Sequence, residues 1–407
     1  MKNSYYLFIL FSLCMGGCNS DNQSKVSENA VNDSSSYDVA AYYWPAYHDE
    51  DRWRPFFQGN EGEWEIIRNS KPKYPGHNQP RKPLWGYEDE SKPEVMEKKI
   101  DAAVAHGVNV MIFDWYWYEG APFLEKCINE GFLKARNNDK IKFYVMWANH
   151  AATTLWDKRR SHKYDTIWPG TVNRENFDKV ADRIISKYMT HPSYYKINGE
   201  PVLSIYEMGT LIAGLGGIQQ TKDALESFRQ KVKKAGFPGL HLQGILWDAF
   251  PEVVSDVPGD KVSTQENTVK ALGINSLTNY QFVHLAEPED DYVKWGNKAI
   301  SFWPKWDTSF SVPYFPHVAT DWDTNPRFDK FKQNIKHNVT AENFKKFLEK
   351  AKAYVDQHPK QPKLITINSW NEWSEGSYLE PDSVNGMKYL EAVKVVFKDT
   401  TVNTSKN

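Results

Sequence analysis

The chain has 407 residues with 50 basic and 52 acidic side chains, and it is rich in aromatic residues, with 16 Trp, 22 Tyr and 21 Phe. This length is enough for one large domain with a single core, or for two ordinary domains. The balanced charge gives no electrostatic reason to expect nucleic acid as a partner, so we expect none.

The first 18 residues have the pattern of an export signal that ends in a lipid-modified cysteine. A single Lys precedes an apolar run of about nine residues, which is too short to span a bilayer as a stable helix. Small residues then lead directly into Cys18, which resembles a bacterial lipoprotein cleavage site. An ordinary signal peptide with an incidental cysteine is the alternative. We expect an exported lipoprotein of a Gram-negative-type bacterium, held to the outer membrane by a lipid on Cys18 alone, on its periplasmic or its surface side.

Residues 19–37 are predicted to be a flexible tether, and residues 38–400 to be one folded domain. The tether is mostly polar and contains no aromatic residue before Tyr37, so it cannot bury a core. Outside the leader the chain has one cysteine, Cys127, and we therefore expect neither an internal disulfide nor a thiolate metal site. The helical apolar spacing of FLEKCINEGF favours a buried core thiol.

From residue 37 onward, short apolar runs alternate with longer helical patterns. Several of the runs are continuously apolar, as expected when both faces of a parallel sheet are buried. Strands are predicted over residues 39–44, 108–117, 141–147, 201–206, 240–248, 274–282, 311–319 and 363–370. Helices are predicted over residues 91–107, 173–189, 222–237, 340–359 and 387–398. The first of these has Ser91 as its predicted N-cap, Pro93 in its first turn and Gly107 as its stop.

Eight strands with intervening helices predict an α/β fold, a single (β/α)8 TIM barrel. The open doubly wound sheet is the structural alternative. That fold normally has a Gly-rich phosphate turn after its first strand, and YYWPAYHDEDRW contains no such turn.

The predicted strand ends share one chemical character. In a (β/α)8 barrel the active site lies at the C-terminal ends of the strands. Nearly every predicted strand ends in an aromatic residue beside a carboxylate or amide, which is typical of a carbohydrate pocket. The predicted stacking residues are Tyr43, Trp44, Trp117, Trp147, Tyr280 and Trp322. The predicted hydroxyl-binding residues are Asp114, Asn149, Glu207, Asp321 and Asn371. Two of these have structural alternatives: Asp321 capping a turn or pairing with Arg327, and Trp147 packing under the rim.

The last strand runs into SWNEWSEG, which contains Glu372 and Glu375 three residues apart. If this segment forms one helical turn, the two side chains project on the same side with Cβ atoms about 5–6 Å apart. Retaining glycosidases need two carboxyl groups separated by about 5–5.5 Å. Two acids this close cannot both ionise freely, so the pKa of one rises. We therefore predict that Glu372 and Glu375 are a catalytic pair, with a solvated loop as the alternative.

Other catalytic chemistries have no sequence signal. The histidines form no H-x-H or H-E-x-x-H arrangement, and no G-x-S-x-G nucleophile elbow is present. We expect no catalytic metal and no cofactor.

Four blocks of the chain resemble the bacterial WbsX-like family, which is related to the endo-α-mannosidase glycoside hydrolases of family 99. The blocks are VMIFDWYWYEG (110–120), SYYKINGEPVLSIY (193–206), FPHVATDWDTNPR (315–327) and INSWNEWSEGSYLEPD (367–382). The resemblance implies a (β/α)8 barrel that acts on α-linked glycans with retention of configuration. It also implies that Glu372 deprotonates the sugar 2-hydroxyl to form a 1,2-anhydro sugar, and that Glu375 is the general acid/base. Direct attack by Glu372 remains open at this point.

Three functions compete. The first is hydrolysis of an α-linked glycan, with α-mannan as the first guess. The second is glycosyl transfer in polysaccharide assembly, which an export leader and the absence of a phosphate-cradling loop disfavour. The third is a surface glycan-binding lipoprotein without turnover, which would need the aromatic rim but not a pair of acids.

Overall fold

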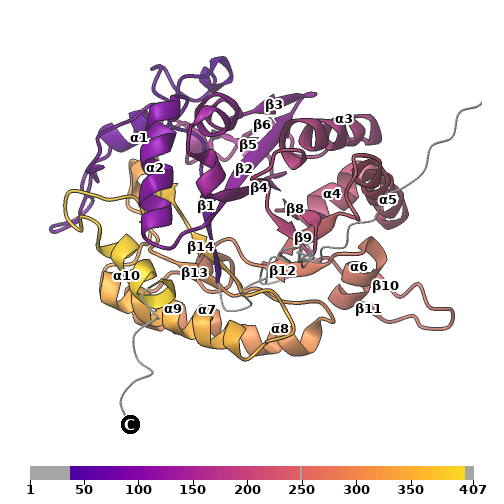
Figure 1. Cartoon of the computed structure of the whole chain (residues 1–407). Helices are drawn as coiled ribbons and strands as arrows, with labels where there is room; N and C mark the ends of the chain where they lie inside the picture. The colour runs from indigo at the N-terminus through magenta and orange to yellow at the C-terminus, as the bar shows by residue number, and fades with distance from the viewer. Residues whose placement is uncertain (1–36, 248–249, 399–407) are drawn as a thin grey trace, which may run out of the picture. The chain divides into compact units, whose positions relative to one another are not determined.

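The computed structural model describes residues 37–247 and 250–398, so Cys18 and nearly all of the predicted tether lie outside it. Eight parallel strands form the centre of the domain (Figure 1). They are β1 (Asp38–Tyr43), β2 (Val110–Tyr118), β4 (Lys142–Trp147), β8 (Glu200–Ile205), β9 (His241–Ile245), β12 (Ser276–Thr278), β13 (His317–Ala319) and β14 (Leu364–Asn368). Each of the eight predicted runs overlaps one of these strands.

The strands close into a barrel. Their order is β12-β9-β8-β4-β2-β1-β14-β13, and a parallel bridge between Leu277 and Tyr314 joins the two ends of this order. The register is continuous at the centre, where Ala41 pairs with Met111 on one side and with Ile367 on the other. The predicted (β/α)8 barrel is therefore confirmed.

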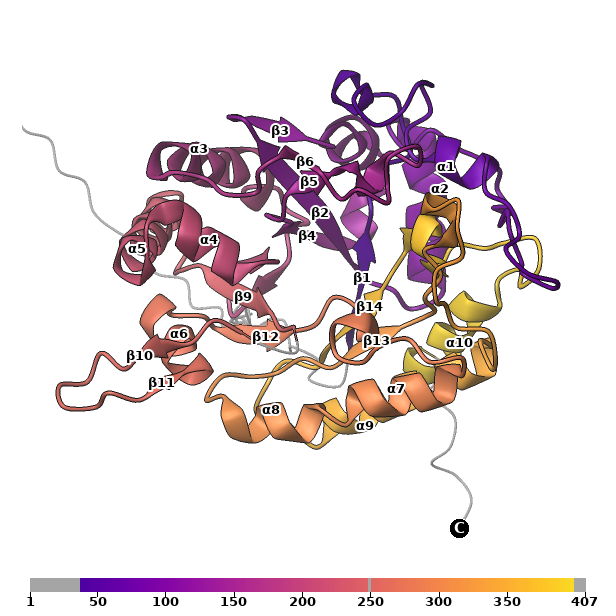
Figure 2. The ribbon, with the colours of Figure 1, turned by 180° about the vertical axis from the view of Figure 1, so that it is seen from behind.

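Helices surround the barrel (Figures 1 and 2). They are α1 (Trp64–Arg68), α2 (Pro93–Ala105), α3 (Arg174–Ile184), α4 (Met208–Leu215), α5 (Ile218–Lys234), α6 (Gln265–Leu272), α7 (Tyr292–Ile300), α8 (Trp303–Ser309), α9 (Ala341–Asp356) and α10 (Lys388–Phe397). The five predicted helices correspond to α2, α3, α5, α9 and α10. The predicted cap of α2 is wrong, because Lys92 occupies the N-cap position and Ser91 instead donates a hydrogen bond to Asp89. None of the described helices is long and apolar enough to cross a membrane.

The segments that follow the C-terminal ends of the strands carry most of the irregular structure. Residues 44–92 form the long connection after β1. The segment after β4 contains β5 (Ala152–Thr153), η5 (Thr154–Trp156) and β6 (Thr166–Trp168), and the segment after β13 contains η8 (Asn325–Arg327). After β14 come β15 (Asn371–Glu372), η9 (Trp373–Glu375) and β16 (Ser377–Tyr378). Smaller additions are β3 (Ala121–Phe123), β7 (Lys196–Ile197) and the hairpin of β10 (Val253–Val254) and β11 (Ser263–Thr264). As predicted, Cys127 is a buried free thiol.

Candidate active site

The predicted acid pair lies on a single tight turn at the end of the last barrel strand. Glu372 ends β15, and Glu375 ends the 3-10 turn η9. Gly376 follows with a left-handed φ of 72°, and a Cβ at this position would lie 3.0 Å from the Cβ of Asp323. Glycine is therefore required here both by conformation and by space. The Asp323 amide donates to the Glu375 carbonyl at 2.6 Å, which fixes the end of the turn.

Both glutamates line a cavity of about 280 Å³ at the C-terminal ends of the strands, which we call the acid-pair cavity. The predicted site residues that line it are Trp44, Asp114, Glu207, Tyr280, Glu372 and Glu375. It is also lined by side chains that were not predicted: Tyr116, His150, Trp156, Tyr206, Trp247 and Arg327. Aromatic rings and carboxylates thus meet in one hollow, as expected for a site that binds a polyhydroxylated ring.

One guanidinium holds the acid pair. Arg327 donates to Glu375 at 2.6 Å and to Glu63 at 3.1 Å, and it lies 3.7 Å from Glu372. Glu63 also accepts hydrogen bonds from Ser374 and from the Trp44 indole, so it connects the turn to the segment after β1. We call Arg327, Glu63, Glu372 and Glu375 the Arg327 cluster. It places three carboxylates around a single cation.

Tyr280 lies between two of the buried carboxyl groups. Its hydroxyl lies 2.8 Å from Asp114 Oδ2 and 2.9 Å from Glu372 Oε1. A phenol has one hydrogen to donate, whereas an ionised carboxylate can only accept. The phenol therefore donates fully to one carboxyl group at a time, and a proton on the other would complete the second bond.

The pKa values of the acids shift in the same sense. Burial raises the pKa of Glu372 well above its ordinary value, and the neighbouring Glu375 raises it further. Burial also raises the pKa of Glu375, but Arg327 opposes the rise there through the direct ion pair. The pKa of Asp114 is raised well above its ordinary value, chiefly by burial. In the free protein, Glu372 therefore holds a proton more readily than Glu375.

Strand alternation explains three predicted residues that do not line the acid-pair cavity. Successive side chains of a strand point to opposite faces. On β2, Asp114 and Tyr116 face the cavity, so Trp117 points away, where its indole donates to Asn176. Trp147 likewise packs beside Phe177 of α3, under the rim. Tyr43 contacts Met96 of α2 through its hydroxyl. Counting by two from Asp114 would have selected Tyr116 rather than Trp117.

The two predicted asparagines hold backbone instead of facing the cavity. Asn149 both donates to the Glu207 carbonyl and accepts from the Glu207 amide, each at 2.8 Å. Asn371 makes the same pair of bonds with the backbone of Trp44, each at 2.8 Å. Buried backbone groups beyond a strand end need such partners. Both asparagines therefore position residues that line the acid-pair cavity.

Asp321 and Trp322 also lie outside the acid-pair cavity. Asp321 pairs with Arg81 at 2.7 Å and lines a separate cavity. The alternative of an Asp321–Arg327 pair is wrong, because Arg327 is bound to Glu375 and Glu63. Trp322 is half-buried and packs against the core.

A second buried ion group also contacts the segment that carries the acid pair. The Lys99 ammonium lies 2.5 Å from both Glu90 and Glu380, and we call these three residues the Lys99 triad. All three are buried, and Lys99 comes from α2. The two carboxylates accept hydrogen bonds from the turn residues Trp370, Asn371 and Trp373 at 2.8–2.9 Å. The segment that carries Glu372 and Glu375 is thus tied to the helix layer.

Within the described residues, no group of three or more His, Cys, Asp or Glu side chains is placed to hold a metal ion. Arg327 is the fixed cation of the acid-pair cavity. His150 also lines it, but burial lowers its pKa. The chemistry offered by these side chains is proton transfer and hydroxyl binding.

A (β/α)8 barrel with an acid pair among aromatic rings defines a glycoside hydrolase-like fold of the carbohydrate-active class. Residues 39–393 match the family described as Glycosyltransferase WbsX, and the chain belongs to this family. Proteins named "Uncharacterized protein WxcX" from two strains of Xanthomonas campestris pv. campestris are 23% identical over 364 residues. These matches cover 88% of this chain and 49% of the relatives, so the chain spans about half of their length.

Solved structures share the fold. The GH99 endo-α-mannosidase from Bacteroides thetaiotaomicron superposes with a TM-score of 0.52 at 13% identity, covering 89% of this chain and 96% of that one. A "Glycoside hydrolase-like protein" gives a TM-score of 0.55 at 16% identity, covering 89% and 94%. The resemblance to the WbsX-like family is therefore confirmed, and the family 99 enzyme shares the fold of this chain.

Proposed function

We propose that this protein is a retaining glycoside hydrolase that cleaves an α-linked glycan, with an α-mannan as the first substrate to test. The observation that carries the proposal is the position of Glu372 and Glu375. Both lie on one turn, line one aromatic cavity and contact one guanidinium. A structural loop has no need for two buried, under-compensated carboxylates, because such groups destabilise a fold.

The reaction assigned by resemblance needs two proton transfers in each of its two steps. In the first step the base takes the proton of the sugar 2-hydroxyl, whose oxygen attacks the anomeric carbon to form the 1,2-anhydro sugar. The acid gives its proton to the leaving oxygen as the glycosidic bond breaks. In the second step the group that acted as the acid takes a proton from the water that attacks the anomeric carbon, and the group that acted as the base returns its proton to the 2-oxygen, so the anhydro ring opens with overall retention. Glu372 is the proposed base and Glu375 the proposed acid/base.

The proton distribution of the free protein runs opposite to these roles. Glu372 holds its proton more readily than Glu375, which is paired with Arg327. After the substrate binds, the proton of Glu372 therefore has to move to Glu375 before the glycosidic bond is cleaved. The alternative is that Glu372 is the acid and Glu375 the base. Two experiments test the site and then separate these cases.

The first experiment measures product release from a panel of α-linked glycans by the wild type and by Glu372→Gln and Glu375→Gln. Each substitution keeps the shape of the side chain but removes proton transfer, so kcat should fall by about 10²–10⁴-fold. Glu349→Gln on the outer helix α9 is the matched control and should leave the rate unchanged. Cleavage that survives both substitutions would place the active site elsewhere. Binding without cleavage by the wild type would favour the glycan-binding alternative.

The second experiment repeats the assay with an α-glycosyl fluoride, whose leaving group departs without protonation. The variant that lacks the acid should regain most of its first step, while the variant that lacks the base should not. Recovery of Glu375→Gln alone supports the assignment by resemblance. Recovery of Glu372→Gln alone means that the roles are exchanged.

Glycosyl transfer is the second candidate, because the family is described as a glycosyltransferase. The same acid pair would pass the sugar to an acceptor hydroxyl instead of water. The acid-pair cavity opposes a nucleotide-sugar donor: its described lining has four carboxylates, and Arg327 is already bound by Glu63 and Glu375. A diphosphate would meet net negative charge. Products longer than the substrate, formed when free oligosaccharide is added, would identify transfer.

Lipid attachment at Cys18 is part of the same proposal, because it would place the enzyme at the outer membrane, where polysaccharides are met. Cys18→Ala should abolish incorporation of labelled palmitate and release the protein from the membrane fraction. Unchanged fractionation of the variant would contradict the lipid anchor.

A further inference from the structure

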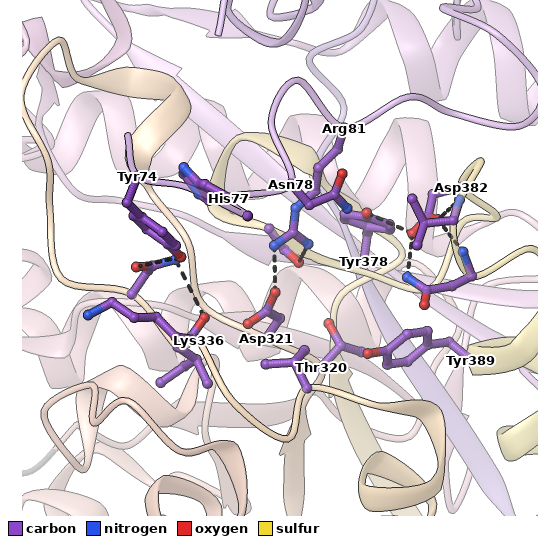
Figure 3. Close-up of a pocket in the computed structure, with 17 residues that line it drawn as sticks. Tyr74, His77, Asn78, Arg81, Thr320, Asp321, Lys336, Tyr378, Asp382 and Tyr389 are labelled. Atoms are coloured by element: carbon purple, nitrogen blue, oxygen red, sulfur yellow. Dashed lines mark hydrogen bonds and ion pairs between the residues drawn. The ribbon is translucent and has the colours of Figure 1, made fainter. Parts of the chain in front are cut away.

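We propose that a second cavity, separate from the acid-pair cavity, binds an uncharged sugar residue. It has a volume of about 200 Å³ and lies among the segments that follow β1, β13 and β14 (Figure 3). We call it the Arg81 cavity, after the side chain that crosses its wall. The class of ligand rests on the proposed function, whereas the existence and position of the site rest on the contacts described next.

An ion pair is built into the wall. Arg81 donates to Asp321 at 2.7 Å and to the Gly376 carbonyl at 2.8 Å, and its buried Nε has no partner among the described residues. Asp321 is 3% exposed, and its other oxygen accepts from the Trp322 amide. Figure 3 shows the Arg81 guanidinium directed at Asp321, to which a dashed line joins it. Such a pair offers sugar hydroxyls both a donor and an acceptor in fixed positions.

Two further polar groups remain available to a ligand. Tyr389 of α10 lines the cavity and is 8% exposed, and its hydroxyl makes no hydrogen bond within the described part of the chain. Asn78 lines the cavity from an exposed position, and its amide likewise has no partner among residues 37–247 and 250–398. Both groups can therefore donate to and accept from the hydroxyls of a bound sugar.

The charges of the lining balance, which favours a neutral ligand. The lining contains two cationic side chains, Arg81 and Lys336, and two carboxylates, Asp321 and Asp382. Lys336 forms an ion pair with Asp290 at 2.9 Å. Asp382 is saturated by backbone and side-chain donors. An anion would therefore find no free cation here. The rings of Tyr74, Tyr378 and Tyr389 also line the cavity, and its volume of about 200 Å³ leaves room for a small ligand such as one sugar ring.

Consecutive residues of one turn line the two cavities. Glu375 lines the acid-pair cavity, and the next residue, Gly376, lines the Arg81 cavity. A sugar that binds Arg81 therefore acts on the same hydrogen bond that holds the Gly376 carbonyl. The Arg81 cavity is thus a second sugar site beside the turn that carries the acid pair.

The test is ligand-observed NMR of the full chain with four probes: methyl α-mannoside, α-glucoside, α-galactoside and α-N-acetylglucosaminide. All variants carry Glu372→Gln, so turnover does not interfere and any binding at the acid-pair cavity is common to all. Asn78→Trp fills the mouth of the Arg81 cavity and should abolish this component of binding. Tyr389→Phe removes one hydroxyl and should weaken it about three- to tenfold. The matched control is Asn60→Trp, at an exposed asparagine outside both cavities.

Loss of binding in Asn78→Trp but not in Asn60→Trp, with unchanged melting temperatures, supports the site. Equal binding by these two variants, or no binding of any probe, overturns it and leaves the hydrolase proposal untouched. Inorganic phosphate that binds where the glycosides do not would also overturn it in favour of an anion site. If the glycosides bind here while no glycan is cleaved, the hydrolase proposal fails and the sugar site stands.

Discussion

Two buried ion groups contact the segment that carries Glu372 and Glu375, and they differ in how many of their carboxylate oxygens have a hydrogen-bond partner. In the Lys99 triad every carboxylate oxygen has a hydrogen-bond donor or the ammonium within reach. In the Arg327 cluster the Glu372 Oε2 atom has no hydrogen-bond partner among the described residues, and neither does the Oδ1 atom of the adjacent Asp114. Both unpartnered atoms belong to residues that line a cavity.

Under the proposed function, the difference separates structural carboxylates from reactive ones. A fully partnered buried network rigidifies its surroundings, whereas an unpartnered carboxylate raises the energy of the folded state. Active sites commonly keep such groups at the expense of stability. Substitutions in the two groups should therefore change different properties. Those in the Lys99 triad should lower stability, and those in the Arg327 cluster should lower activity.

The largest expected effect is on the Lys99 triad. Lys99→Met leaves two buried carboxylates without their cation, so the free energy of unfolding should fall by about 3–5 kcal/mol in urea titrations. Lys98→Met is the matched control on the same helix, because Lys98 is 39% exposed and its pair with Glu88 should contribute less than about 1 kcal/mol. Equal losses in the two variants would remove the distinction between the two clusters. If Lys99→Met does not fold, Lys99→Arg, which keeps the charge, should fold.

The next effect is on Arg327. Arg327→Met removes the one cation that opposes the burial of both glutamates, so kcat/KM should fall by about 10²–10³-fold. Burial raises the pKa of Glu375 and Arg327 lowers it, so without Arg327 that pKa rises. Arg327 also lowers the pKa of Glu372, so both limbs of the pH–rate profile should move to higher pH. Arg327→Lys keeps a positive charge and should hold both limbs near their wild-type positions. The same shift in both variants would show that geometry, not charge, is responsible.

The features that could be predicted from the sequence are those that a local pattern of residues determines. The barrel was predictable because buried parallel strands are continuous apolar runs, and the acid pair because both glutamates lie on one short turn. Trp117 was chosen in place of Tyr116 because the strand end was read without its alternation. That error was avoidable from the sequence.

Other features depend on contacts that no local pattern encodes. Glu63 and Arg327 are 264 positions apart in the chain, and Asn371 reaches Trp44 across 327 positions. Lys99 lies at a buried position of α2, although a lysine in a helix would be predicted from the sequence to face solvent. These partners are fixed by barrel closure, which brings the segments after the first and last strands together.

A smaller effect concerns stability and pH at Glu372. Because burial raises its folded pKa, Glu372 keeps a proton in the folded chain after it has lost it in the unfolded chain. Stability from this group is therefore present below the unfolded pKa, and it is lost as pH rises toward the folded pKa. Glu372→Gln removes that loss, so the variant should be more stable than the wild type by an amount that grows with pH. The gain is about 1.4 kcal/mol per unit of pKa elevation. A difference that is independent of pH would contradict a protonated Glu372.

The smallest expected effect is on Tyr280, the hydroxyl between Asp114 and Glu372. Tyr280→Phe keeps the ring against the substrate but removes both hydrogen bonds, at 2.8 and 2.9 Å. Each is a bond to a carboxyl group, so kcat should fall about tenfold while KM changes little. Without the phenol the two acids lose the bridge through which they share a proton, and the basic limb of the pH–rate profile should move. A tyrosine that only packed would alter KM and leave both limbs in place, so the split between kcat and KM decides whether the phenol takes part in proton sharing.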